Sequence, residues 1–140
     1  MRIALRLSVD EIVEILARGL AGGDRRRILA VYLFGSVARG EDRPDSDVDL
    51  AFLMPLALDP LLVYDVAGEL SSRLGRDVDL VDLRSANAVM RAQVVGHGTR
   101  IYEQDSYAVS EFEMYAFSDH ARLQEERRPV AEAFLARYRG

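Results

Sequence analysis

The chain has no cysteine and only two histidines among its 140 residues. Without cysteine, disulfides, thiolate zinc sites and cysteine nucleophiles are excluded. His97 and His120 are far apart in the sequence, and neither has a second histidine at ligand spacing, so we do not expect a zinc site. No apolar run approaches the length of a membrane span, and the first residues lack the uninterrupted apolar stretch of a signal peptide. These absences predict a cytoplasmic protein.

The chain also has too few basic residues for stable binding of a long nucleic acid. The chain has 18 Lys and Arg against 23 Asp and Glu, a formal net charge of −5. Proteins that hold long nucleic acids through the phosphates present a basic face. We therefore expect no direct, stable binding of nucleic acid. A nucleotide can still bind if metal ions offset the local negative charge.

The apolar content, 49% on a broad count, is enough for one α/β domain spanning 1–140, with a core over about 1–104. Ser8 and Glu11 form a capping-box pattern for a first helix that Gly22–Gly23 ends. Asp59–Pro60 is typical of the start of a second helix, which Gly75 ends. Apolar patterning predicts strands over 28–34, 46–54, 77–83 and 99–103, and a further helix over 86–96.

The last part of the chain, about 105–140, is predicted to be a helical tail. Phe112, Tyr115, Phe134 and Tyr138 have the spacing of helix faces, which indicates a core or an interface. Pro129 is expected to end or kink the helix, because proline removes one backbone donor and clashes with the preceding turn.

The segment with the clearest chemistry begins with Gly35–Ser36, where a buried strand gives way to a turn and a short helix. Glycine allows a phosphate to come close to the backbone. Free amides at a helix start, together with the serine hydroxyl, can hold phosphate oxygens.

Two carboxylates follow ten residues later, at Asp47 and Asp49. Residues i and i+2 of a strand face the same way, about 6 to 7 Å apart. Such carboxylates repel each other unless a cation lies between them, and oxygen ligands are those that Mg²⁺ prefers. Gly-Ser and Asp-x-Asp together, each preceded by a strand, therefore indicate a metal-dependent nucleotide site.

This signature resembles that of the DNA polymerase β-like nucleotidyltransferase superfamily. The longer text G-S-V-A-R-G-x-x-x-P-D-S-D-V-D-L, from Gly35 to Leu50, is similar to its small prokaryotic branch, the minimal nucleotidyltransferase (MNT) antitoxins. The resemblance extends from about Leu29 to Glu103. It implies a small mixed β-sheet with helices packed on one face, in the polymerase β-like nucleotidyltransferase fold.

The resemblance also implies a third carboxylate on a neighbouring strand, and the sequence DVDLVDL offers three. Asp79 is the first choice, because Val78 and Leu80 then point together into the hydrophobic layer. Asp82 is the second choice and Asp77, next to the loop, is the third. A single sequence does not fix the register of this strand.

The same resemblance assigns roles to these residues. Asp47, Asp49 and Asp79 would hold two Mg²⁺ ions, and Gly35 and Ser36 would anchor the β- and γ-phosphates of ATP, which is the substrate. Asp79 would also help to remove the proton of the acceptor. Arg39 is a candidate phosphate ligand, although Glu41, Asp42 or Asp45 of the same loop are alternative partners.

The implied function is transfer of AMP from ATP to a hydroxyl, that of a tyrosine, on a cognate HEPN-domain RNase toxin, with which the chain would form a hetero-oligomer. About 35 residues of tail are too few for a deep acceptor pocket, which favours an acceptor supplied by a partner protein. Two alternatives stay open: a non-catalytic antitoxin that occludes its toxin, and a small-molecule nucleotidyltransferase.

Overall fold

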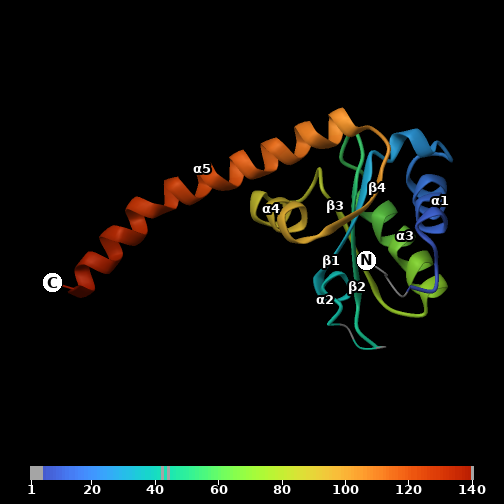
Figure 1. The fold of residues 1–140 in the computed structure, drawn as a ribbon, viewed down its shortest axis with the longest axis horizontal. Coiled ribbons are helices and arrows are strands. Elements are labelled where there is room, and N and C mark those ends of the chain that lie inside the picture. Colours follow the sequence, from blue (N-terminus) through green and yellow to red (C-terminus); the bar gives the residue numbers. More distant parts are fainter. Residues whose placement is uncertain (1–4, 42, 44, 140) are drawn as a thin grey trace.

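A computed structural model of the chain describes residues 5–41, 43 and 45–139. Its centre is a four-stranded sheet in the order β3-β2-β1-β4 (Figure 1). The strands are β1 (Ala30–Phe34), β2 (Val48–Leu53), β3 (Val78–Asp82) and β4 (Thr99–Glu103). β1 runs antiparallel to β2 and β4, whereas β2 and β3 are parallel. The expected mixed sheet is confirmed, and β3 and β4 are its two edges.

Two helices, α1 (Val9–Leu20) and α3 (Pro60–Leu74), cover one face of the sheet. The predicted signals at their ends are present. Ser8 and Glu11 form a complete capping box, the Asp59 side chain accepts a hydrogen bond from the Leu61 amide, and Gly75 ends α3 with φ of 70°. Each device satisfies backbone groups that the helix cannot pair itself.

The second face is covered by α4 (Ala88–His97) and the start of α5 (Ser106–Arg139). Val109 and Phe112 of α5 are buried against this face. The buried Tyr32 hydroxyl donates to Glu113 Oε1 at 2.7 Å, and Arg100 Nη1 donates to the same oxygen at 2.7 Å. Helices therefore cover both faces of the sheet, whereas the sequence predicted them on one face, because α4 and the first turns of α5 pack on the second face.

The tail is one helix, α5, rather than two (Figure 1). Pro129 is expected from the sequence to end or kink the helix. It does not end the helix, which continues from Ser106 to Arg139. An internal proline removes one helical hydrogen bond but leaves the other bonds of the helix in place. The side chains of Phe134 and Tyr138 lie outside the described part of the structure. Beyond the body the helix extends away from the sheet.

Two short elements complete the fold, a 3₁₀ turn η1 (Arg25–Arg27) and the helix α2 (Gly35–Arg39). Within the described residues, no helix has the length and hydropathy needed to cross a membrane.

Candidate active site

The turn from β1 into α2 requires glycine at residue 35. Gly35 has φ of 70°, a left-handed conformation that strains other residues. A β-carbon at this position would overlap Asp49 Oδ2. The backbone of the turn therefore lies against the carboxylate of β2, so the two parts of the predicted signature, Gly35–Ser36 and Asp47–Asp49, meet in space.

Asp49 and Asp79 are direct neighbours on the parallel strands β2 and β3. Adjacent strands lie about 4.8 Å apart, and residues in register point to the same face. Asp47 directly precedes β2, two residues before Asp49, and its charge acts on Asp49. The fold brings the three predicted carboxylates together at one end of the sheet.

The electrostatics of Asp49 reflect this crowding. Burial raises the pKa of the Asp49 carboxyl above its usual value, and the nearby charges of Asp79 and Asp47 raise this pKa further, while Arg39 lowers it. A divalent cation would offset this repulsion, and the donor set is all oxygen, as Mg²⁺ requires. The residues present thus fit a Mg²⁺ site, although no group of three described acidic or histidine side chains is already arranged around a metal position.

The other two aspartates of β3 have different surroundings. Asp82 is buried at 7% exposure, and its carboxylate accepts hydrogen bonds from the amides of Leu58 and Arg84 and from the Ser85 hydroxyl. Asp77 is exposed just before β3. Asp82 points to the face opposite Asp79 and serves the fold, so Asp79 stays the predicted third ligand.

Arg39 lies at the end of α2, next to one of its expected alternative partners, Glu41. Asp42, another of these alternatives, lies outside the described residues. Its guanidinium forms an ion pair with Glu41 at 3.0 Å, and its charge also acts on Asp49. Both side chains of the ion pair are exposed. The phosphate contact stays a prediction.

Sequence reasoning missed Arg76, which connects the loop before Asp47 to the start of β3. Arg76 Nε donates to the Ser46 carbonyl at 2.8 Å, and Arg76 Nη2 donates to the Arg43 carbonyl at 3.0 Å. Ser46 Oγ accepts from the Arg43 amide at 2.8 Å. Arg76 thus holds the loop before Asp47 against the start of β3. The local sequence does not predict this contact, because Arg76 is simply an arginine that follows Gly75 at the end of α3.

A comparison with known families matches residues 21–107 to the family described as polymerase beta, nucleotidyltransferase. The chain belongs to the polymerase β nucleotidyltransferase family. The match contains Gly35, Ser36 and all three carboxylates of the site. The resemblance predicted from the signature is therefore confirmed, and so is the fold.

Relatives within this family are similar over nearly their whole length. Protein adenylyltransferase MntA of Shewanella oneidensis is 34% identical over 135 residues, which are 94% of this chain and 90% of that protein. A crystal structure of a toxin-antitoxin with AMP-PNP has a TM-score of 0.80 at 32% identity, covering 92% of this chain and 99% of the other.

A second similar structure contains a tri-AMPylated Shewanella oneidensis HEPN toxin in complex with MNT antitoxin. It has a TM-score of 0.72 at 30% identity, covering 90% of this chain and 94% of the other. The two structures share the fold of this chain over 92% and 90% of its length.

Proposed function

We propose that this chain is a protein adenylyltransferase and an antitoxin that transfers AMP from ATP to a tyrosine of a HEPN-domain partner. The observation that carries the proposal is the convergence of Asp47, Asp49 and Asp79 beside the Gly35 turn. The similar proteins named as an adenylyltransferase and as an MNT antitoxin with an AMPylated HEPN toxin support it.

Each part of the site has one role in this proposal. Gly35 and Ser36 bind the β- and γ-phosphates, because a glycine without a side chain lets phosphate oxygens approach the free amides at the start of a helix. Asp47 and Asp49 would hold Mg²⁺, which would supply positive charge for the triphosphate, and Asp79 accepts the proton of the acceptor hydroxyl. Two bound Mg²⁺ ions would lower the pKa of that hydroxyl and offset charge on the leaving pyrophosphate. Arg39 adds a further positive charge beside the phosphates.

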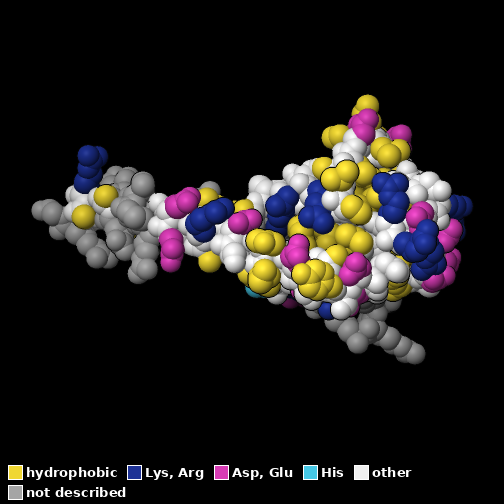
Figure 2. Space-filling model, turned by 90° about the horizontal axis from the view of Figure 1, so that it is seen from above, with side chains coloured by type: hydrophobic (Ala, Val, Ile, Leu, Met, Phe, Trp, Pro, Cys, Tyr) yellow, Lys and Arg dark blue, Asp and Glu magenta, His cyan; other side chains and the backbone are white. Residues whose placement is uncertain are grey.

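The acceptor comes from another protein, because the helical tail beside the α/β core is too small to enclose a bulky acceptor. We assign the docking surface to α5. Beyond the first turn of α5, its described side chains include four large hydrophobic residues, each at least half exposed: Met114, Tyr115, Phe117 and Leu135. Seen from above, hydrophobic side chains lie at the surface of both the body and the projecting helix (Figure 2). A projecting helix with exposed apolar side chains is suited to bind a partner.

The test is co-expression of the chain with a HEPN-domain partner, followed by intact-mass spectrometry of the partner. Wild type should add one or more AMP units to the partner tyrosine. The double variant Asp47→Asn with Asp49→Asn should add none but still bind the partner, because metal ligands act mainly in the transition state.

Protection of cells separates catalysis from simple binding. The double variant should fail to protect cells at matched expression. Equal protection by the double variant and wild type would show that occlusion, not AMP transfer, neutralises the partner. The α5 surface would support such a function as well.

A further inference from the structure

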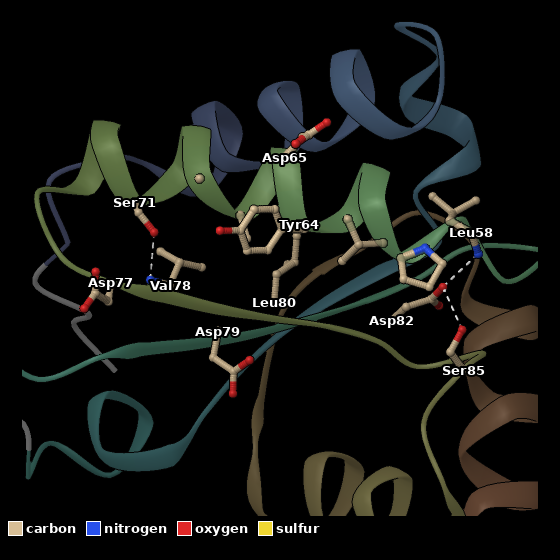
Figure 3. A pocket seen from close by; sticks show the side chains of 14 residues that line it. Leu58, Tyr64, Asp65, Ser71, Asp77, Val78, Asp79, Leu80, Asp82 and Ser85 are labelled. Carbon is tan, nitrogen blue, oxygen red and sulfur yellow. Dashed lines mark hydrogen bonds between the residues drawn. The ribbon is translucent and has the colours of Figure 1, made fainter.

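A groove of about 810 Å³ lies between α3 and the free edge of β3. Leu58, Pro60 and Val63 form its apolar end, and Val78 and Leu80 of β3 form its floor (Figure 3). The Tyr64 ring, 77% exposed, lies over the β3 edge near Leu80. Asp79, the predicted third carboxylate, also lines the groove, so the groove adjoins the active site.

The hydrogen bonds of β2 show which groups of β3 point into the groove. The Val48 amide donates to the Asp77 carbonyl, and the Leu83 amide donates to the Phe52 carbonyl. Odd-numbered residues of β3 therefore bond to β2, while Val78 and Leu80 direct their amide and carbonyl groups outward. Within the described residues, no other strand pairs with this edge.

Both ends of the outward edge are closed. At one end, Ser71 Oγ accepts from the Val78 amide at 2.9 Å (Figure 3). At the other end, the Asp82 carbonyl accepts from the amides of Ser85 and Ala86 at 3.1 and 3.0 Å. Between these contacts, Leu80 is the open position. An exposed strand edge is a template for an added extended segment.

We propose, building on the adenylyltransferase function, that an extended segment of the partner adds to the β3 edge and presents its tyrosine beside Asp79. Side chains of a strand alternate between the two faces of a sheet. A tyrosine level with Asp79 then points to the face of the carboxylates, and its two neighbours point into the groove. The segment must therefore carry apolar residues directly before and after the tyrosine.

The direction of the reaction agrees with this placement. In phosphoryl-group transfer the attacking and leaving oxygens lie roughly in line. The tyrosine oxygen forms a bond to the α-phosphorus, the bond to the bridging oxygen breaks, pyrophosphate leaves, and the phenolic proton goes to Asp79. The leaving group lies at the Gly35 turn, so the acceptor enters from the Asp79 side, where the groove is. Asp79 points away from α3 in Figure 3, toward the side that holds α2.

Short synthetic peptides with a single tyrosine test the proposal without the rest of the partner. Leucine on both sides of the tyrosine should give at least about tenfold higher kcat/KM for AMP transfer than glutamine on both sides, because the floor and one end of the groove are apolar. Glutamine is used because a charged glutamate would also be repelled by Asp65 and Asp77 of the groove. Equal rates for the two peptides would overturn the proposal.

Backbone methylation of the leucine peptide tests strand addition. In an antiparallel addition the neighbours of the tyrosine bond to β3, and in a parallel addition the tyrosine itself does. The amides of the two neighbours and the amide of the tyrosine are therefore methylated in separate peptides. Methylation in one of these two cases, and not in the other, should lower kcat/KM by about tenfold. Equal effects at both, or none at either, would rule out an added strand.

Tyr64→Ala tests from the side of the protein whether the groove binds the leucines that flank the tyrosine. This variant should lower kcat/KM for the leucine peptide several-fold but leave an alanine-flanked peptide and Mg-ATP affinity unchanged. Tyr107→Ala is the matched control, because Tyr107 is 79% exposed but lies in the first turn of α5, after the opposite edge strand β4. Equal effects of the two variants would contradict the proposal.

These results are distinct from those that test the function itself. If wild type modifies the folded partner but no peptide, the groove proposal fails while the adenylyltransferase function stands. If wild type modifies neither, the proposed function fails and the groove proposal fails with it.

Discussion

The carboxylate end of the sheet and the projecting part of α5 differ in how the chain supports them. Asp49 lies between β1, β3 and the Gly35 turn, where neighbouring residues fix its position. The first turns of α5 are buried at Val109, Phe112 and Ala116, whereas the described side chains near its far end, such as Leu135, are exposed. The first region holds catalytic groups in a fixed geometry, and the second presents side chains to a partner. Changes in the first should therefore affect AMP transfer, and changes in the second should affect binding of the partner.

The largest effect expected is on catalysis, from Asp79→Asn. Losing one carboxylate ligand should lower AMP transfer about 1,000-fold, because metal stabilisation of transition-state charge is worth several kcal/mol. Thermal stability should hardly change, since Asp79 is exposed. Asp82→Asn should instead retain transfer and lose about 1–3 kcal/mol of stability, because a buried acceptor of three hydrogen bonds is altered. Transfer assays and thermal melts of both variants check this, and the reverse pattern would assign the third ligand to Asp82.

Gly35→Ala should lower transfer about 100-fold, a value typical of misplaced catalytic groups. The added β-carbon would displace the Asp49 carboxylate. Gly40→Ala is the control, because Gly40 has nearly the same φ, 71° against 70°, but a β-carbon there would meet no described atom within 4 Å beyond its chain neighbours and its own helix. Steady-state kinetics of the two variants separates backbone strain from displacement of Asp49. Similar losses in both would make strain the cause.

Changes in α5 should affect capture of the partner. Met114→Ala with Phe117→Ala should weaken binding at least about tenfold, since interface energy concentrates in exposed apolar anchors of this kind. Mg-ATP affinity should not change. Calorimetry with the partner and with Mg-ATP measures both quantities. A loss of Mg-ATP binding would mean that the two regions are not independent.

The smallest effect concerns the stability of the metal-free protein. Because the pKa of Asp49 is raised in the folded chain, its ionised form destabilises the fold. Asp49→Asn should therefore raise Tm slightly, by roughly 1 to 3 °C, in EDTA at neutral pH. The difference should shrink as the pH falls through the raised pKa, because Asp49 is then protonated and neutral. Asp65→Asn, at an exposed carboxylate of α3, is the control, and a lower Tm for Asp49→Asn would contradict the sign.

Local signals in the sequence were enough for much of the fold. The Ser8 capping box, the Asp59–Pro60 helix start and the strand that ends at Gly35 are short-range patterns with a direct physical cause. The order of the strands, the second helical layer and the single helix through Pro129 depend on contacts between distant segments, which these patterns do not contain.

The candidate site shows the same limit. Gly35 and the Asp47–Asp49 pair stand out in the sequence because their spacing is itself a motif. The three aspartates in and next to β3 are less distinctive. Strand alternation puts Asp79 and Asp82 on opposite faces, but only the register with β2 places Asp79 beside Asp49. The contact of Arg76 with the loop before Asp47 joins residues 30 positions apart. It requires the parallel pairing of β2 and β3 to exist first.

The length of α5 determines how far its C-terminal end lies from the carboxylates of the active site. Its 34 residues span about 51 Å at the usual helical rise of 1.5 Å per residue. A partner held only near residue 135 would lie tens of ångströms from the carboxylates of the same molecule. Such a partner must either span this distance to present its tyrosine to the same molecule, or present the tyrosine to a second copy of the chain. Shortening α5 from its C-terminal end, one turn at a time, would shorten the distance that the partner must span.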